Sequence, residues 1–260
     1  MTAKNENDLM EKIVSLAKRR GFVFQGSEIY GGLAGTWDYG PLGVALKKNI
    51  ENLWWRMFVE DREDMYGIDS AILMNPKVWQ ASGHVGGFSD PLVECKKCKR
   101  RFRADQVGEK CPNCDGEFGE ARQFNMMFRT SVGSVEGEES TVYLRPETAQ
   151  GMFVNFKNII DSYHPRLPFG IAQIGKAFRN EIAPRDFIFR VRELEIMEFE
   201  YFVEEKKWEE LFEYWRKKMH QWFKALGFDE SDIKEEEIGD GDRDHYSKRT
   251  IDFHFKYPHK

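Results

Sequence analysis

The sequence lacks several features that would place a protein in a special class. No run of 18 or more apolar residues occurs in the 260-residue chain, so we expect no membrane-spanning helix. The polar start, residues 1–12, has no apolar core of the kind that a secretory signal needs. Internal repeats and low-complexity tracts are also missing. These absences predict a soluble protein located in the cytoplasm.

A large excess of charge of one sign is missing too. Lys and Arg number 39, and Asp and Glu number 44, which gives a net charge of −5. This balance argues against a protein that binds nucleic acid through its overall charge, but it is compatible with RNA held by a local basic patch. The length and the 41% hydrophobic content predict one large domain, or one domain with a small insertion.

Cysteine is absent except in one short segment, where four residues follow the spacing C-x2-C-x12-C-x2-C. Two knuckles of this spacing can arrange four thiolates as a tetrahedron around one zinc ion. Lys96, Lys97 and Lys99 would moderate the negative charge of such a site. Two disulfides or four free thiols are the alternatives, and a cytoplasmic location disfavours the disulfides. The predicted zinc ligands are Cys95, Cys98, Cys111 and Cys114.

Hydrophobic periodicity and turn residues predict a mixture of helices and strands. Helices are expected at residues 8–20, 42–65, 148–162 and 207–226, and strands at 69–74, 143–145, 171–181, 188–203 and from 251. Residues 26–43 are expected to form an ordered aromatic loop, 134–140 a polar turn and 229–244 an acidic solvated loop. Long antiparallel strands mixed with helices, without regular βαβ alternation, predict an α+β fold.

The strands expected at 171–181 and 188–203 carry an unusual number of charges. A loop with Pro184 and Arg185 joins them, so Arg179 and Glu181 would lie beside a second group of charged side chains. That group is Arg190, Arg192, Glu193, Glu195 and Glu198. Charges on strands are costly without partners, and a forked guanidinium on a rigid strand suits a phosphate. We interpret the group as a ligand site, with cross-strand ion pairs as the alternative.

The two-residue period of a strand assigns these side chains to faces. Arg179 and Glu181 would share a face of the first strand. On the second strand Leu194, Ile196, Glu198 and Glu200 would share one face, and Glu193, Glu195, Met197, Phe199 and Tyr201 the other. Glu198 follows two apolar residues on its face and needs a cation or a hydrogen-bond donor, a need that a substrate ammonium group would meet. Glu147 offers a second acid before a helix, where helix capping explains it almost as well.

Several motifs resemble one known family. Phe178-Arg179-Asn180-Glu181, with a loop and then Arg190-Val191-Arg192-Glu193, resembles the second signature motif of class II aminoacyl-tRNA synthetases. The segments Arg145–Gly151, Trp37–Gly43 and Ser82-Gly83-His84 resemble glycyl-tRNA synthetases of the homodimeric type. The resemblance covers essentially the whole chain. It implies an antiparallel class II sheet flanked by helices, with the Pro41 helix and the Pro76 strand as the dimer-building first motif.

The resemblance also implies a role for each site residue. Arg179 and Glu181 would be catalytic, with Arg179 on the α-phosphate of ATP and Glu181 on the adenine side or the loop. Glu147 and Glu198 would hold the glycine ammonium group. The other ATP-site residues would be Asn180, Phe189, Arg190, Val191, Arg192, Glu193 and Leu194. The other glycine-site residues would be Arg103, Leu194, Glu195, Ile196 and Met197.

The activity implied by the resemblance is glycine–tRNA ligation by a homodimer. ATP, with Mg²⁺ on its phosphates, would activate glycine to glycyl-adenylate, and the glycyl group would pass to tRNA(Gly). Leu194 and Ile196 stand where the family usually has Phe and Gln, which puts aromatic stacking on adenine at position 194 in question. The third signature motif and an anticodon-binding domain would lie beyond Lys260. We therefore expect a part of a longer enzyme or a truncated relative.

The expected division of the chain is 1–92 for the first part of the catalytic domain, 93–120 for the zinc insertion and 121–260 for the core with the ATP hairpin. Two other hypotheses stay open. One is a non-catalytic, synthetase-like module with an RNA-binding or accessory role. The other is a nucleic-acid-binding zinc protein, which the charge of −5 and the short cysteine segment disfavour.

Overall fold

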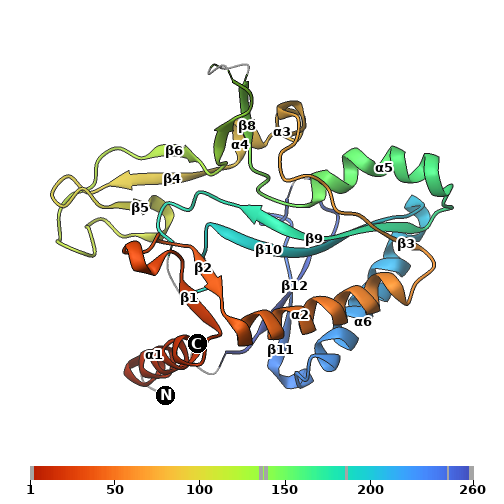
Figure 1. Ribbon diagram of the computed structural model, residues 1–260, viewed down its shortest axis with the longest axis horizontal. Coiled ribbons are helices and arrows are strands. Elements are labelled where there is room, and N and C mark those ends of the chain that lie inside the picture. The colour runs from red at the N-terminus through yellow and green to blue at the C-terminus, as the bar shows by residue number, and fades with distance from the viewer. Residues whose placement is uncertain (1–2, 135–136, 138–139, 185–186, 245, 258–260) are drawn as a thin grey trace.

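A three-stranded sheet forms the centre of the protein. The computed structural model describes residues 3–134, 137, 140–184, 187–244 and 246–257. Strands β9 (Phe169–Phe178) and β10 (Glu193–Phe202) pair antiparallel over their whole length, and β3 (Met65–Gly67) lies parallel to β9 on its other side (Figure 1). The predicted antiparallel pair and the α+β fold are confirmed.

The remaining elements surround this sheet. The helices are α1 (Ala3–Arg19), α2 (Pro41–Trp55), α3 (Pro76–Ala81), α4 (His84–Gly87), α5 (Ala149–Tyr163) and α6 (Trp208–Ala225). A π-helical turn, Arg56–Glu60, continues α2. The other strands form smaller sheets. The two-stranded sheets pair β1 (Val23–Gln25) with β2 (Trp37–Tyr39), β7 (Arg129–Ser131) with β8 (Thr141–Tyr143), and β11 (Ile233–Glu237) with β12 (Ile251–Phe255). A three-stranded sheet has β4 (Ser89–Glu94) between β5 (Arg101–Arg103) and β6 (Arg122–Asn125).

The two faces of the β9–β10 pair pack against different helices, because side chains alternate across a strand. On one face Phe169 and Phe202 pack against α5. On the other face Phe199 packs against Trp54 of α2 and Trp215 of α6. Figure 1 shows α5 on one side of the sheet and α2 and α6 on the other. Burial of each large aromatic contributes about 1.5–3 kcal/mol, so the two clusters position the charged strands firmly.

The central strands are shorter than predicted at their charged ends. β9 stops at Phe178 and β10 starts at Glu193, so the segment between them, residues 179–192, includes Arg179 and Glu181. The expectation that these two side chains share a strand face is therefore wrong. Arg185 of the predicted loop lies outside the described residues.

Contacts with distant segments end the two strands. The backbone N–H of Phe178 donates to the carbonyl of Arg145 at 2.9 Å, and the N–H of Arg192 donates to the carbonyl of Gly35 at 2.7 Å. Among the described residues, one backbone hydrogen bond continues the pairing past β9, from Arg179 N to the Arg192 carbonyl at 2.9 Å. Side-chain alternation in the local sequence carries no sign of these partners.

The region after α2 also differs from the prediction. The helix predicted at 42–65 ends with its π-helical turn at Glu60, and β3 starts five residues later. Residues 69–74 are not a strand, apart from one isolated bridge at Leu73. Pro76 begins a helix instead of ending a strand. Proline suits this place because the first residue of a helix needs no N–H donor.

The N-terminal prediction is confirmed in outline. α1 ends at Arg19, and Gly21 follows with φ of +70°, a conformation in which glycine is favoured. The segment 26–43 is ordered, as expected. It is more than a loop, however, because β2 pairs antiparallel with β1 inside it.

The middle of the chain shows smaller shifts. The strand predicted at 143–145 is β8, two residues earlier, which leaves Arg145 buried with 2% of its surface exposed. The predicted turn at 134–140 lies partly outside the described residues. The helix predicted at 148–162 is confirmed as α5.

For the C-terminal part of the chain, the prediction is correct for α6 and β12 and wrong for the loop between them. Within the predicted acidic loop 229–244, residues 233–237 form β11, which pairs antiparallel with β12. Glu235 is not solvated on its own but accepts hydrogen bonds from Arg216 of α6. Trp215 and Trp222 of α6 pack against the core cluster around Trp54, as predicted.

None of the helices in the described ranges is long and apolar enough to cross a membrane. The cytoplasmic location stays a prediction, and so does the division into three parts. β4 runs across the expected boundary at residues 92 and 93, because it pairs with β5 on one side and β6 on the other.

Candidate active site and metal centre

Three glutamates gather where α5 begins against β10. Glu147 comes just before the helix, and Glu198 and Glu200 lie on the β10 face that α5 covers. The hydroxyl of the fully buried Thr148 donates a short hydrogen bond to Glu198 Oε2 instead of capping α5. The structure thus brings Glu147 and Glu198 together and adds Glu200. We call these three residues the acid cluster.

Glu147 has two polar neighbours. Its Oε2 lies 3.3 Å from His84 Nε2, and its Oε1 accepts from Gln150 Nε2 at 3.1 Å. Burial opposes ionisation, but His84, Gln150 and the nearby Arg179 together hold the pKa of Glu147 below its ordinary value. Among the described residues, no backbone N–H of α5 donates to this carboxylate, so its contacts do not support the helix-cap alternative.

The other two acids of the cluster are short of positive charge. Burial, together with Glu147, raises the pKa of Glu198, although the Thr148 hydrogen bond opposes the shift. Burial and the two neighbouring acids raise the pKa of Glu200 to about 7. Within the described ranges no Lys or Arg forms an ion pair with either carboxylate. A bound ammonium group would supply the missing charge.

Arg179 borders the acid cluster from the 179–192 segment. Its Nε donates to the carbonyl of Pro146 at 3.1 Å, and its guanidinium carbon lies 5.6 Å from the centre of the Phe88 ring. Its charge acts on both Glu147 and Glu198. In the part of the chain that the structure describes, its two terminal nitrogens donate to no other residue. Arg179 can therefore face an anion next to the acids.

The chain's own backbone holds the rest of the 179–192 segment. Arg192 donates from Nη1 to the carbonyl of Ala34 at 2.8 Å and from Nη2 to that of Glu181 at 2.9 Å. The N–H of Asn180 donates to the carbonyl of Met126 at 2.7 Å. Glu181 Oε2 and Arg192 Nε are buried without a hydrogen-bond partner among the described residues. A ligand or water could satisfy both atoms.

Two other residues predicted for ATP contact other parts of the chain. Arg190 donates from Nη1 to Gln106 Oε1 at 2.9 Å, which ties the 179–192 segment to the cysteine-containing region. The Phe189 ring lies 5.3 Å from the Tyr257 ring, edge to face. Both residues are therefore held by contacts outside the acid cluster.

The opposite face of the sheet borders a cavity of about 500 Å³ between α1, α2 and the start of β10. Glu195 forms an ion pair with Lys47 of α2, and Met197 joins the cluster around Trp54. Glu193 pairs with Lys176. Val191 and Leu194 also border this cavity. The structure does not bring Glu195 and Met197 to the acid cluster, because odd positions of β10 point away from α5.

Ile196 and Arg103 take different positions. Ile196 lies opposite Gly175 of β9, on the strand face that also carries Glu198. Arg103 in β5 is paired with Asp105 and with Asp90, whose Oδ2 is 2.7 Å from Arg103 Nη1. The hydrogen bonds that Arg103 donates to Asp105, followed by the charges of the acids around it, raise the pKa of Arg103. One of those acids is Glu181, so Arg103 adjoins the 179–192 segment and not the acid cluster.

Sequence reasoning missed four polar residues at the acid cluster. Glu200 follows the same two-residue alternation that assigned Glu198 to its strand face, so the sequence did contain a signal for its position. His84 lay in a recognised motif without an assigned role. Thr148 gave no sign of its contact. Gln173, opposite Glu198 in the β9–β10 register, is fully buried, accepts from Ser70 Oγ at 2.8 Å and leaves its Nε2 without a partner among the described residues.

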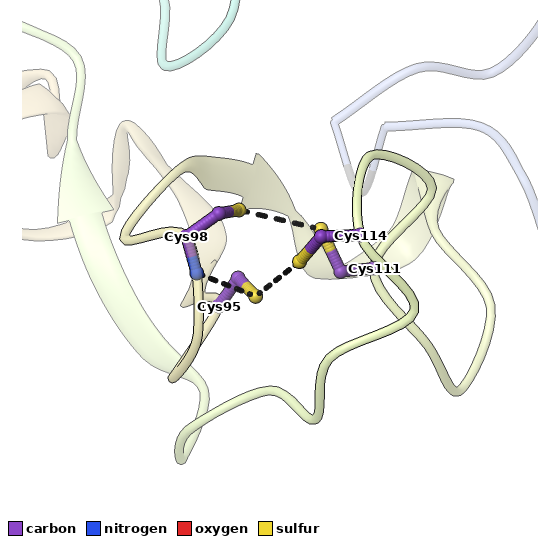
Figure 2. A group of neighbouring side chains, drawn as sticks. All are labelled: Cys95, Cys98, Cys111 and Cys114. Atoms are coloured by element: carbon purple, nitrogen blue, oxygen red, sulfur yellow. Dashed lines mark hydrogen bonds between the residues drawn. The ribbon is translucent and has the colours of Figure 1, made fainter.

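The four cysteines converge as predicted. Their sulfur atoms all lie within 4.8 Å of one another, and Figure 2 shows the side chains pointing into one space. Cys95 Sγ is 3.5 Å from Cys114 Sγ, and Cys98 Sγ is 3.7 Å from Cys111 Sγ. A tetrahedron with metal–sulfur bonds of about 2.3 Å has edges of about 3.8 Å, which these separations approach. A disulfide bond of about 2.05 Å does not match them.

The surroundings of the sulfurs also fit a metal. The backbone N–H of Cys98 donates to Cys95 Sγ and, as the main cause, lowers the pKa of that thiol to about 6. A Cβ at Gly116 would lie 3.0 Å from Cys95 Sγ and 2.8 Å from Lys97 Cβ, so only glycine packs there without a shift. Cys95 and Cys111 are fully buried. This group can hold one tetrahedral ion.

Comparison with known proteins adds sequence evidence. A family described as "tRNA synthetase class II core domain (G, H, P, S and T)" matches residues 128–258. A glycine–tRNA ligase of Treponema denticola is 50% identical over 96% of this chain and 56% of its own length. One of Borreliella burgdorferi is 52% identical over 96% and 57%, and one of Bacillus thuringiensis is 49% identical over 96% and 61%. The chain therefore spans between half and two thirds of the length of these relatives.

A solved structure supports the fold. The RNA-binding domain of a threonyl-tRNA synthetase from Cryptosporidium parvum superimposes with a TM-score of 0.56 and 18% identity, over 85% of this chain and 43% of the other. At that identity the likeness concerns the fold alone. The fold of most of this chain is thus similar to part of a protein of distant sequence.

Proposed function

The chain belongs to the class II aminoacyl-tRNA synthetase core family, and from that membership we propose that it forms the amino-acid-activating part of a glycine–tRNA ligase. The enzyme would join glycine to ATP, giving glycyl-adenylate and pyrophosphate, and then transfer the glycyl group to tRNA(Gly). The observation that carries the proposal is that Glu198 and Glu200 have no Lys or Arg ion-pair partner among the described residues. They lie near Arg179, whose terminal nitrogens donate to no other residue in the described ranges. Relatives named glycine–tRNA ligases, about 50% identical, support the same substrate.

The acid cluster would bind the glycine ammonium group. Glu147 and Glu198 would accept its hydrogen bonds, and Thr148 would keep Glu198 oriented toward it. Ile196, one step along the same face, would limit the space next to the α-carbon. A pocket that excludes every side chain selects glycine, since each competitor is larger. The ammonium charge would also lower the pKa of the two partner acids.

Arg179 would bind the α-phosphate of ATP and stabilise the charge that develops there. In the chemical step, a glycine carboxylate oxygen forms a bond to the α-phosphorus while the bond to the bridging oxygen breaks and pyrophosphate leaves. Little covalent chemistry is asked of the protein, because positioning and charge stabilisation supply the rate. Mg²⁺ bound to the ATP phosphates would neutralise part of their charge.

The 179–192 segment would hold the rest of ATP. Its proposed contacts are Asn180, Glu181, Phe189, Arg190, Val191, Arg192, Glu193 and Leu194. The buried, unpartnered Glu181 Oε2 and Arg192 Nε support a ligand at the inner part of the segment. Arg190 and Phe189 already contact Gln106 and Tyr257, so they would have to exchange these contacts for ATP.

A structural zinc ion would occupy the four-cysteine cluster. Four thiolates suit zinc, and a site with four protein ligands leaves no open position for catalysis. We expect one zinc per chain by elemental analysis. Removal of the ion by a chelator should unfold the region around β4, β5 and β6, because metal-binding energy is folding energy in such small modules. An apo protein with the full melting temperature would contradict the structural role.

Dimer formation through α2 is a further part of the proposal. Leu42, Val44 and Leu46 at the start of α2 are 44–51% exposed, and Ile29 and Tyr30, between β1 and β2, are 88% and 87% exposed. Apolar residues exposed in one area are typical of a surface that another subunit covers. Sedimentation equilibrium on the chain and on a Leu42→Glu, Leu46→Glu variant would test this proposal.

Glycine-dependent ATP–pyrophosphate exchange tests the enzymatic proposal. The assay should use this chain and a version extended to the length of its relatives. We expect exchange in the extended protein at least, with glycine and not with alanine. Absence of exchange in the extended protein would contradict the proposal and favour a non-catalytic RNA-binding module. Exchange in the extended protein alone would show that further residues complete the site.

A further inference from the structure

A chain of side-chain contacts runs from the end of α3 through α4 to Glu147 of the acid cluster. Ser82, the residue after α3, has its hydroxyl oxygen 2.8 Å from His84 Nδ1. The other ring nitrogen, His84 Nε2, lies 3.3 Å from Glu147 Oε2. Ser82 and His84 are thus linked to the acid cluster, although the proposed contacts with glycine and ATP include neither of them.

The His84 ring is held in a fixed position. It packs edge to face on the fully buried Trp79 ring at 5.4 Å and against the Phe88 ring at 5.4 Å. Asn125 Nδ2 donates to the backbone carbonyls of His84 and Val85 at 3.1 and 2.8 Å, which anchors the start of α4. Only 14% of the His84 side chain is exposed. A ring confined by packing and hydrogen bonds directs its two nitrogens at defined partners.

The partners of the two ring nitrogens determine which nitrogen carries hydrogen. A carboxylate only accepts hydrogen bonds, so the nitrogen that faces Glu147, Nε2, has to be a donor. In a neutral imidazole the other nitrogen, Nδ1, is then an acceptor and needs a hydrogen from Ser82. The Ser82 hydroxyl can supply it, because its contact of 2.8 Å with Nδ1 is shorter than its contact of 3.4 Å with the carbonyl of Trp79. A neutral His84 therefore satisfies both ring nitrogens.

In this arrangement Glu147 receives a neutral donor at each oxygen. Gln150 Nε2 donates to Oε1 at 3.1 Å, and His84 faces Oε2. Burial opposes ionisation of Glu147, and the hydrogen bond from His84 is the first of the contacts that lower its pKa. Neutral donors fix the direction of a carboxylate and leave its negative charge for a ligand, whereas an imidazolium would pair with that charge. Thr148 makes the same kind of contact with Glu198.

We propose that Ser82 and His84 are positioning residues for Glu147: Ser82 fixes the neutral tautomer with hydrogen on Nε2, and this N–H orients the carboxylate toward the glycine ammonium group. The inference rests on the proposed function for its substrate. Phe88 extends the arrangement, because its ring also lies 5.6 Å from the guanidinium carbon of Arg179. The segment from Ser82 to Phe88 would thus support both the amine side and the phosphate side of the site.

Two amide substitutions that differ by one carbon separate the roles of the two ring nitrogens. His84→Gln can place its amide nitrogen where Nε2 lies and keep a donor for Glu147, but it has no group in the place of Nδ1. His84→Asn reaches only the place of Nδ1 and loses the donor for Glu147. Pyrophosphate exchange by the extended protein, at varied glycine and at varied ATP, measures the effect of each substitution.

We expect the KM for glycine to rise about tenfold in His84→Asn, the effect of losing one hydrogen bond to a charged group, while kcat changes by less than about threefold. His84→Gln should stay within about threefold for glycine, and the KM for ATP should stay within about twofold in both variants. His220→Asn, which removes a histidine–glutamate contact between α6 and β11, is the matched control and should leave both KM values unchanged.

Ser82 is tested by a double-mutant cycle. Ser82→Ala should raise the KM for glycine about threefold in the unsubstituted protein, because the tautomer of His84 is no longer fixed. In the His84→Gln background Ser82→Ala should have no further effect, since no Nδ1 remains for the hydroxyl to contact. Equal effects in the two backgrounds would mean that Ser82 does not act through His84, and the inference would fail.

Nuclear magnetic resonance reads the tautomer without the enzymatic assay. The ring nitrogens of ¹⁵N-labelled histidine give different signals with and without hydrogen. The chain has six histidines, and the signals of His84 are the ones that His84→Gln removes. At pH 7.5 we expect hydrogen on Nε2 alone in the original chain and exchange between the two tautomers in Ser82→Ala.

Hydrogen on Nδ1 alone, or on both nitrogens at pH 7.5, would overturn the inference. Equal losses in His84→Asn and His84→Gln, for glycine and ATP alike and with a lowered melting temperature, would do the same, because the ring would then only fill space. A protein without glycine-dependent exchange would contradict the proposed function. The ring signals would still judge the inference in that case, and unchanged signals in Ser82→Ala would overturn it.

Discussion

Two regions of this protein collect glutamates, and they treat them in opposite ways. In the acid cluster, Glu198 and Glu200 are half-buried without a Lys or Arg partner in the described ranges, and burial raises the pKa of both. Between α6 and β11–β12, Glu235 accepts from Arg216 and His220, and these contacts lower its pKa to about 2. Glutamates thus lack cationic partners in the acid cluster and have a full set of them in the region between α6 and β11–β12, which we call the saturated region.

The difference separates a ligand site from a structural joint. In the second region Arg249 also links Glu213 of α6 to Glu237 of β11, so the network ties the helix to the hairpin. The charges of this network are paired with one another, so the network needs no ligand to balance them. In the acid cluster, burial and the neighbouring acids disfavour the charged forms of Glu198 and Glu200, a cost that a bound cation can offset. Strong charge alone therefore does not identify a site; missing partners do.

The largest expected effect is on catalysis. Glu198→Gln keeps the hydrogen bond from Thr148 but removes the charge that would hold glycine, so kcat/KM for glycine should fall about 100-fold, or about 2.7 kcal/mol. Pyrophosphate exchange at varied glycine and fixed ATP measures this change. Glu237→Gln in the saturated region is the control and should leave exchange within twofold. If the Glu198→Gln protein showed normal dependence on glycine, the acid cluster would not be a glycine site and would not differ in function from the saturated region.

The next effect is on stability and concerns the saturated region. Glu235→Gln should lower the free energy of unfolding by about 1–2 kcal/mol at pH 7, because Arg216 loses its main partner. Glu235 has a depressed pKa, so its contribution is present above the ordinary value of 4.5 and is lost as pH falls toward 2. Urea unfolding at pH 7 and pH 3 should show the difference between the two proteins shrinking in acid. A constant difference would mean that packing, and not charge, holds this joint.

The smallest effect has the opposite sign and lies in the acid cluster. The raised pKa of Glu200, about 7, means that the folded protein keeps a proton that the unfolded chain releases near 4.5. Stability should therefore fall as pH rises between these values and stay low above pH 7. Glu200→Gln removes this cost and should be more stable by about 1 kcal/mol at pH 8, with no gain at pH 4.5. Glu236→Gln, an exposed acid of β11, should show no such dependence.

Much of the architecture could be predicted because its signals are local. The period of 3.6 in residues 207–226 reflects the apolar stripe of α6, and the cysteine spacing is a property of two short turns. The alternation along β10 placed Glu198 and Glu200 on one face without reference to any other segment. Such patterns need only the geometry of one element.

The errors fall where distant segments meet. The hydrogen bond from Arg192 N to Gly35 spans more than 150 residues of sequence, so no local pattern could mark the true start of β10. The prediction of a strand at 69–74 was wrong because a proline such as Pro76 is equally compatible with the end of a strand and the start of a helix. Glu235 was assigned to a solvated loop because its partners, Arg216 and His220, belong to another element.

The sequence by itself determined the α+β elements, the cysteine cluster and the shared strand face of Glu198 and Glu200, since each depends on spacing within one element. Only the tertiary structure decided which acids have partners. Thr148 meets Glu198, and His84 meets Glu147, across 50 and 63 residues. Ionisation depends on burial and on charges a few ångströms away, and chain folding alone brings those groups together.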